Sequence, residues 1–249
     1  MIAKPRRVIA NITPAVLICK SARVVELLEN RFMAKKIVLI GDSICIGYRE
    51  FVKERFNGVA EVFFPKCNCA FALNVLRYLN IWKDEDGLPS DADAVHFNVG
   101  LWDVLRIYGD DTLTSPEYYV ETLIRVYKRI RLLFPAAKVI FATTTTVAED
   151  AYAPPYQRYN ADIEKFNELA KNSLNKFRVE INDLYAITKT VGSDSKYRSD
   201  STHFDTEEGI KLLGEAVINS ICNSLEIPVD RLNDTKAKIT TVSEKILRN

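Results

Sequence analysis

The chain has 249 residues, of which 47% are hydrophobic and 27% are charged, and its formal net charge is +1 at pH 7. This length and apolar content suit one main globular domain. The scattered, balanced charges argue against nucleic acid as a partner, and no apolar run reaches the roughly 20 residues of a membrane-spanning helix.

The five cysteines and two histidines lack the spacing of a conventional zinc site. An odd number of cysteines without a disulfide pattern favours reduced thiols in a cytoplasmic protein. We therefore expect a cytoplasmic location, with no metal and no cofactor.

Residues 1–34 differ in character from the residues that follow. Arg6 and Arg7 precede a mostly apolar stretch that Pro14 interrupts, which resembles a signal peptide only weakly, so secretion is the alternative to a cytoplasmic location. We expect an N-terminal extension over residues 1–34, a folded domain over residues 35–228, and a polar, loosely packed tail over residues 229–249.

From residue 35 onward, strand-like and helix-like segments alternate. A first strand begins at Lys35, and further strands are predicted over residues 60–64, 93–99, 138–143 and 177–181. Helices are predicted over residues 44–56, 71–82, 115–134, 156–176 and 205–225, the third opened by Ser115 as cap and the last by a capping box from Asp205 to Glu208. Five strands that alternate with helices imply a parallel sheet with helices on both faces.

The first strand ends abruptly in Gly41-Asp42-Ser43. A hydroxyl at the carboxyl end of a parallel strand, beside the N-terminus of a helix, lies in the crevice where open α/β sheets bind ligands. Ser43 is therefore placed as a nucleophile would be. The alternative is that Asp42 or Ser43 only caps the next helix, as these residue types often do.

One histidine follows the fifth strand, in Asp200-Ser201-Thr202-His203. An aspartate three residues before a histidine can accept a hydrogen bond from Nδ1 and leave Nε2 free to take a proton. Asp-x-x-His alone is common in surface turns, but Ser43 is predicted to open on the same crevice. The other histidine, His96, lies within a buried strand and is expected to be a hydrogen-bonded core residue.

These segments resemble the sequence blocks of the SGNH, or GDSL-type, hydrolases over roughly residues 35–225. Gly41-Asp42-Ser43 matches the family's first block, and Asp200-Ser201-Thr202-His203 matches its last. The third block, usually Gly-x-Asn-Asp, is Gly100-Leu101-Trp102-Asp103 here, so Trp102 replaces the asparagine. The second block, which normally offers a glycine amide, falls within residues 67–72, where no glycine occurs.

The resemblance implies a flavodoxin-like three-layer α/β/α sandwich with a five-stranded parallel sheet. It also implies ester hydrolysis or acyl transfer, with Ser43 as nucleophile, His203 as base and Asp200 as its support. We expect a serine esterase that acts on a small or acetylated carbohydrate ester. The alternatives are an acyltransferase of the same fold and a binding protein that has lost its oxyanion hole.

The departures from the family fall on this oxyanion hole. An amide within the stretch from Asn68 to Ala72 is one expected donor, because a backbone donor needs glycine only where φ is positive. Trp102, next to Gly100, offers an indole N–H or forms a wall of the pocket, and Asn98 is the competing donor. The expected oxyanion and substrate-binding residues are Asn68, Ala72, Asn98, Gly100 and Trp102.

The loop after the fourth strand is rich in aromatic residues, among them Tyr152, Tyr156, Arg158 and Tyr159. Sugar rings stack on aromatic faces, so this loop is a candidate wall for a carbohydrate ester, and a rigid solvent-facing loop is the alternative. Arg106 and Tyr108, after the third strand, are further candidates.

Overall fold

The computed structural model describes residues 34–236, and a parallel sheet forms the centre of this part. Its five strands lie in the order β2-β1-β3-β5-β7, and every neighbouring pair is parallel. The strands are β1 (Lys35–Ile40), β2 (Ala60–Phe63), β3 (Ala94–Phe97), β5 (Lys138–Ala142) and β7 (Glu180–Asn182). The predicted α/β fold with a five-stranded parallel sheet is confirmed.

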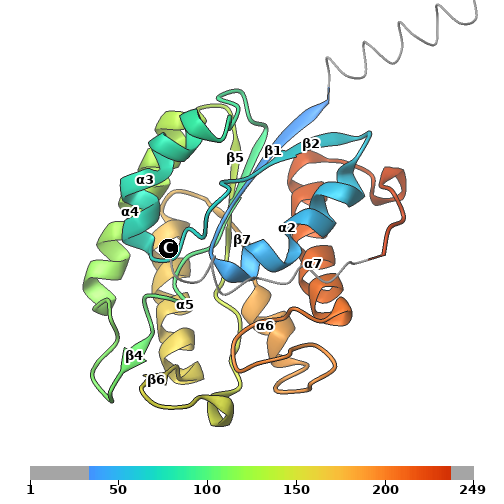
Figure 1. The fold of residues 1–249 in the computed structure, drawn as a ribbon. Coiled ribbons are helices and arrows are strands. Elements are labelled where there is room, and N and C mark those ends of the chain that lie inside the picture. The colour runs from blue at the N-terminus through green and yellow to red at the C-terminus, as the bar shows by residue number, and fades with distance from the viewer. Residues whose placement is uncertain (1–33, 237–249) are drawn as a thin grey trace, which may run out of the picture. The chain divides into compact units, whose positions relative to one another are not determined.

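Helices cover both faces of this sheet and complete a three-layer sandwich (Figure 1). On one face α2 packs against α7, and on the other face α3, α4 and α5 lie side by side. The long helices are α2 (Ser43–Phe56), α3 (Ala72–Glu85), α4 (Pro116–Leu133), α5 (Asn160–Asn175) and α7 (Glu207–Leu225). Because all five strands run the same way, the loops that follow them gather at one edge of the sheet.

The strand β1 owes its position to its apolar sequence. Residues 37–40 are each 0% exposed, as expected of a strand with neighbours on both sides and helices on both faces. His96 of β3 pairs with Leu39 of β1 and is also fully buried. Its Nε2 lies 3.1 Å from the Asn182 amide nitrogen, and burial lowers the pKa of His96 to about 3. His96 is thus a hydrogen-bonded residue of the core.

The start of α7 differs by one residue from the predicted capping box. Thr206 is the N-cap, and its Oγ1 accepts a hydrogen bond from the Gly209 amide at 3.0 Å. Asp205 instead accepts bonds from the amide and the hydroxyl of Ser199, at 3.0 Å and 2.7 Å. The Asp205 carboxylate therefore closes the preceding loop, which leaves the capping role to Thr206.

The helix predicted over residues 156–176 begins only at Asn160. The residues before it form the short strand β6 (Tyr156–Gln157), which pairs antiparallel with β4 (Arg106–Ile107). The predicted fifth strand is also shifted, since β7 starts at Glu180, and it is followed by the short helix α6 (Leu184–Lys189), which was not predicted. The β4–β6 ribbon links the loop after β3 to the loop after β5.

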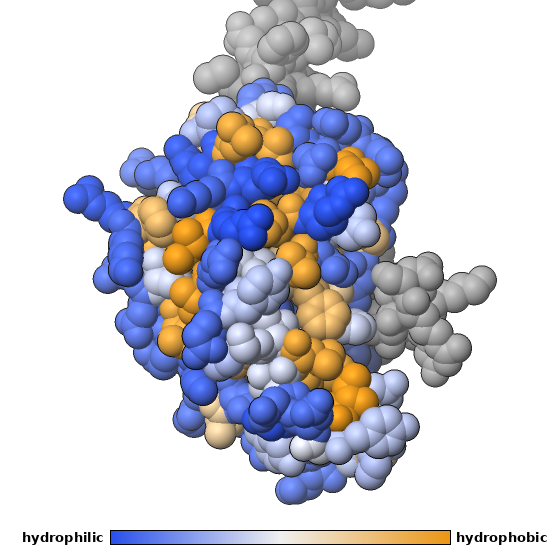
Figure 2. Space-filling model, turned by 90° about the vertical axis from the view of Figure 1, so that its left-hand side faces the viewer, coloured by the Kyte–Doolittle hydropathy of each residue, from blue (hydrophilic) through white to orange (hydrophobic). Residues whose placement is uncertain are grey.

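The surface over α3 and α4 is mainly polar (Figure 2). Figure 2 looks onto the side that carries α3 and α4 and shows hydrophilic side chains with separate apolar patches between them. In α4 the buried residues include Leu123, Val126 and Ile130, at the spacing of one helix face. The apolar side of this helix therefore faces the sheet.

The first residues of the predicted C-terminal tail pack against the end of α2. Leu232 is only 8% exposed, and the Asn233 amide donates to the carbonyl of Arg55 at 3.0 Å. Among residues 229–236, Leu232 is the buried residue, and the others are exposed or half-buried. The predicted N-terminal extension, apart from Ala34, and the tail beyond residue 236 lie outside the described residues.

Candidate active site

Ser43 is the first residue of α2, directly after the turn that ends β1. Asp42 is the N-cap, and its carboxylate accepts a hydrogen bond from the Ile44 amide at 3.0 Å. The capping role expected for this tripeptide therefore belongs to Asp42. The amide of Ser43 is among the first N–H groups of the helix, which have no acceptor within the helix.

A hydrogen-bonded chain joins Ser43 to His203 and Asp200. His203 Nε2 lies 2.8 Å from Ser43 Oγ, and His203 Nδ1 lies 2.7 Å from Asp200 Oδ2. The other Asp200 oxygen accepts the amides of Thr202 and His203, both at 2.6 Å, which holds the turn closed. The structure thus brings together the three residues that two distant sequence motifs predict.

The charge of the Asp200 carboxylate determines which atoms of Ser43, His203 and Asp200 carry protons. Partial burial alone would raise its pKa, but the hydrogen bonds from the His203 ring and from the two amides lower the pKa to about 2. At neutral pH Asp200 is therefore an acceptor only, and Nδ1 of His203 carries the proton. In the neutral ring, Nε2 is then free to accept a hydrogen bond from the Ser43 hydroxyl. From this position Nε2 can take the proton of the serine.

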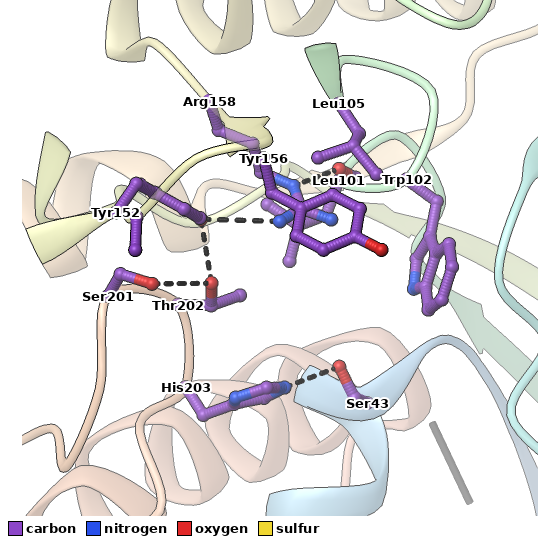
Figure 3. Close-up of a pocket in the computed structure, with 11 residues that line it drawn as sticks. Ser43, Leu101, Trp102, Leu105, Tyr152, Tyr156, Arg158, Ser201, Thr202 and His203 are labelled. Carbon is purple, nitrogen blue, oxygen red and sulfur yellow. Dashed lines mark hydrogen bonds between the residues drawn. The ribbon is translucent and has the colours of Figure 1, made fainter. Parts of the chain in front are cut away.

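Ser43 and His203 open into a cavity of about 480 Å³ (Figure 3). Its walls come from the loop after β3, from the loop around β6 and from the turn before α7. The lining residues are Ser43, Leu101, Trp102, Leu105, Tyr152, Ala153, Tyr156, Arg158, Ser201, Thr202 and His203. A cavity of this size, with mainly apolar walls and a few polar groups, is typical of a small-molecule site.

Asn98 follows β3, and its side chain is directed at Asp42 rather than into the cavity. Its Nδ2 donates to Asp42 Oδ1 at 3.0 Å. Gly41 leaves room for this contact, because a Cβ at that position would lie 2.1 Å from Asn98 Oδ1. Burial raises the pKa of Asp42, against the hydrogen bonds from Asn98 and Ile44. Asn98 therefore braces the turn that presents Ser43.

The second block lies beside this turn, with Ala70 at a φ of 49°, in the left-handed region that favours glycine. The Ala70 amide donates to Asn68 Oδ1 at 3.0 Å, while Asn68 Nδ2 is buried without a partner in the described part. The amide of Ala72 donates to Asp103 Oδ2 at 3.1 Å. Neither Asn68 nor Ala72 lines the cavity, and the Ala72 amide already has an acceptor.

Asp103, the last residue of the third block, ties this block to the start of α3. Its second oxygen accepts the Thr114 hydroxyl at 2.9 Å. The residue is 1% exposed, and burial raises the pKa of its carboxyl to about 6 despite the hydrogen bonds from Ala72 and Thr114. The sequence marked Asp103 only as part of a motif, because its partners lie 31 and 11 residues away.

Within the same block, Trp102 reaches the cavity and Gly100 does not. Gly100 has a φ of 137°, and a Cβ there would lie 2.6 Å from Thr144 Oγ1. Trp102 packs on Phe71, with the ring centroids 5.5 Å apart, and Figure 3 shows its ring nitrogen on the cavity side. The indole thus forms one wall of the cavity.

Three of the expected loop residues, Tyr152, Tyr156 and Arg158, line the cavity. Arg106 instead pairs with Asp162 at 2.8 Å, and Tyr108 is 87% exposed. Sequence reasoning missed several lining residues, namely Leu101, Leu105, Ala153, Ser201 and Thr202. Leu101, Ser201 and Thr202 belong to the sequence blocks that are expected to lie near Ser43. Membership of these blocks was the signal that could have identified them as lining residues.

Neither a metal cluster nor a membrane-spanning helix is found in the part of the chain that the structure describes. Among residues 34–236, no three His, Cys, Asp or Glu side chains are grouped to hold a metal ion. Over the same residues, no helix is long and apolar enough to cross a bilayer.

The sequence matches no protein-family model and no curated protein. Several solved structures are similar in fold. A lipase/acylhydrolase from Enterococcus faecalis has 22% identity and a TM-score of 0.60 over 82% of this chain and 100% of that one. A GDSL-like lipase from Bacteroides thetaiotaomicron has 16% identity and a TM-score of 0.59 over 76% and 89%.

An acetyl xylan esterase has 16% identity and a TM-score of 0.57 over 75% of this chain and 99% of that one. At these identities the likeness concerns the fold, and the strand order and the layers of helices agree with it. The domain described here therefore has the fold of the GDSL-like lipases and acylhydrolases.

Proposed function

We propose that the protein is a serine esterase of the SGNH, or GDSL, type, with Ser43 as nucleophile, His203 as general base and Asp200 as its support. The observation that carries this proposal is the hydrogen-bonded chain of 2.8 Å and 2.7 Å that ends on Ser43 at the cavity. A serine hydroxyl is a weak nucleophile unless an adjacent base takes its proton. The shared fold with lipases and acylhydrolases supports the same reaction class.

In the proposed reaction, Ser43 Oγ bonds to the ester carbonyl carbon while His203 Nε2 takes the hydroxyl proton. The tetrahedral intermediate collapses, the bond to the alcohol oxygen breaks, and His203 returns the proton to that oxygen. Water then attacks the acyl-enzyme, with its proton passing to His203 and on to Ser43 Oγ. This releases the carboxylic acid and restores the serine.

The oxyanion needs hydrogen-bond donors that are already in place. The Ser43 amide at the start of α2 is the donor with the best support. The side-chain amide of Asn68 has no partner among the described residues, but Asn68 does not line the cavity, so it ranks below the Ser43 amide as a candidate. Ala72 and Asn98 are weaker candidates, because Asp103 and Asp42 already accept their N–H groups.

The cavity limits the substrate to a small ester or to one end of a larger one. Its volume of about 480 Å³ and its apolar walls suit a short acyl or aryl group. Tyr152 and Tyr156 offer aromatic faces to a sugar ring. An acetylated carbohydrate is therefore the substrate class we propose, which fits the name of one structural neighbour, an acetyl xylan esterase.

The test compares two serines that line the same cavity, Ser43 and Ser201. Hydrolysis of 4-nitrophenyl acetate is measured for Ser43→Ala and, as the matched control, for Ser201→Ala. We expect Ser43→Ala to lower kcat by at least about 1000-fold and Ser201→Ala to change it less than about fivefold. Wild-type turnover in Ser43→Ala would refute the proposal.

A further inference from the structure

One cation in the cavity has no counter-charge. Arg158 follows β6 and is only 8% exposed, yet within the described residues no carboxylate lies within ion-pair distance of its guanidinium. Its Nε donates to the Leu101 carbonyl at 2.7 Å and its Nη1 to the Tyr152 hydroxyl at 3.3 Å. Both acceptors are neutral.

A guanidinium has five N–H donors, and these two bonds use two of them, which leaves three without an acceptor in the described part of the chain. Arg158 lines the same cavity as Ser43 and His203, and Figure 3 shows its guanidinium behind the Tyr156 ring, between Tyr152 and Leu101. Burying a charge without a partner is costly. An arginine in this setting therefore suggests an anion that arrives with the ligand.

Carboxylates of the site itself do not meet this need. Asp42 Oδ1 accepts bonds from the Ile44 amide and from Asn98, and Asp42 Oδ2 is buried without a partner among the described residues, so Asp42 makes no ion pair with Arg158. Asp200 is held by His203 and two amides. The Arg158 charge reaches Asp42 only at long range, as one of the weaker influences that lower its pKa. Among the described residues, no carboxylate of the site therefore neutralises the positive charge of Arg158.

A second buried arginine, Arg198, allows a comparison with a residue that has a purely structural role. Arg198 is 3% exposed and also has no ion pair in the described part, but its donors bond to Thr146 and Ser201 and its guanidinium lies 4.0 Å above the Phe204 ring. Arg198 does not line the cavity. Arg198 Nε is also buried without a partner among the described residues, and the Arg158 guanidinium also lies near a ring, 5.8 Å from the Tyr152 centroid. The two arginines therefore differ in their position, because only Arg158 lines the cavity and can meet a ligand there.

We propose that Arg158 binds a carboxylate group of the substrate, so that the cavity selects esters that carry one negative charge beside the scissile bond. This inference rests on the proposed esterase function. A planar guanidinium pairs with a carboxylate through parallel hydrogen bonds, and such charge-assisted bonds are strong where apolar walls exclude water. Leu101, Leu105 and Trp102 provide such walls.

The carboxylate belongs to the alcohol part or to the acyl part of the ester, and two substrate pairs distinguish these sources. For the alcohol part, 4-acetoxybenzoate is compared with its methyl ester. For the acyl part, monomethyl adipate is compared with dimethyl adipate. Within each pair, the ratio of the two kcat/KM values is compared between protein variants, so the intrinsic reactivity of the esters cancels.

The wild-type protein is expected to prefer the charged ester in at least one pair, relative to the hydroxide-catalysed rates of the same pair. Arg158→Gln should lower that preference by about 10- to 100-fold, mainly through a higher KM for the charged ester. Arg158→Lys should keep part of it, and Arg198→Lys, the matched control, should keep all of it. A wild type without preference in either pair, or an unchanged preference in a folded Arg158→Gln protein, would overturn the inference.

A binding measurement separates this inference from the esterase proposal. The Ser43→Ala protein cannot form an acyl-enzyme by the proposed route, so calorimetry can follow ester binding without turnover. We expect it to bind the preferred charged ester at least about tenfold more tightly than the neutral one, and the Ser43→Ala/Arg158→Gln protein to lose this difference. If the wild type hydrolyses no ester but this difference persists, the esterase proposal fails and the carboxylate site stands. If Ser43→Ala shows no difference, the carboxylate site fails.

Discussion

At the scale of single residues, Trp102 takes one of its two expected roles, whereas Asn98 takes a role that the sequence did not suggest. Trp102 forms a cavity wall against Phe71, whereas Asn98 donates to Asp42 and supports the turn before Ser43. The resemblance located both positions near the site. It gave no hint of the Asn98–Asp42 bond, because that contact depends on how β3 lies beside β1 and joins residues 56 positions apart.

Replacement of Trp102 by Phe tests its role as a wall. The smaller ring keeps most of the apolar surface and removes the indole N–H. We expect kcat to change less than about threefold and KM to rise, because a wall contributes to binding of substrate and transition state alike. Steady-state kinetics with 4-nitrophenyl acetate gives both constants. A fall in kcat of about 100-fold or more with unchanged KM would instead make the indole an oxyanion donor.

At the scale of elements, the Asp103 carboxylate joins the loop after β3 to the first turn of α3 through Thr114 and Ala72. In the folded protein its pKa is about 6, against an ordinary value of 3.8. Between these values the folded state holds a proton that the unfolded state has released. The free energy of unfolding therefore falls as the pH rises through this window, by about 3 kcal/mol for this group.

Asp103→Asn removes this titration. Urea unfolding of both proteins is measured at intervals from pH 4 to pH 7. We expect the wild type to lose stability relative to Asp103→Asn as the pH rises, with the difference levelling off above about pH 6. Parallel stability curves would show that the carboxyl does not titrate in this window. The comparison cancels the contributions of Asp42 and Asp200, which both proteins share.

Elements with a strong periodic pattern could be predicted from the sequence, and short elements could not. The long helix α4 has a capping serine, a proline at its first position and one apolar face, and it was predicted within one residue at each end. The ribbon of β4 and β6 has two residues in each strand, too few for any alternation to show. Its pairing brings the loop after β3 to Tyr156, beside Arg158, and so completes the cavity.

At the scale of the whole molecule, the regular alternation of strands and helices predicts the sheet, because parallel strands need helical crossovers. Ser43 and His203 could be placed together for the same reason, since loops after parallel strands share one edge. The lining of the cavity could not be predicted in this way. It depends on side chains from three separate loops whose conformations have no local sequence signal.

A chain that begins at Met33 tests the predicted domain boundary. The compact unit that includes the sheet starts at Lys35, the first residue of β1. We expect the shortened protein to unfold cooperatively, with a Tm within about 3 °C of the full chain, and to hydrolyse esters at the same rate. Calorimetry and the ester assay measure these two properties. Insolubility or a broad, non-cooperative transition would mean that earlier residues belong to the core.

The central claim is that His203 activates Ser43. Its most direct test is covalent labelling with a fluorophosphonate, which requires an activated serine and makes no demand on ester specificity. Intact-mass and peptide mass spectrometry should find one adduct, located on Ser43, formed rapidly in the wild type and in Ser201→Ala and at least about 1000-fold more slowly in His203→Ala. An unlabelled Ser43 in the folded wild-type protein, or equal labelling in His203→Ala, would contradict the claim.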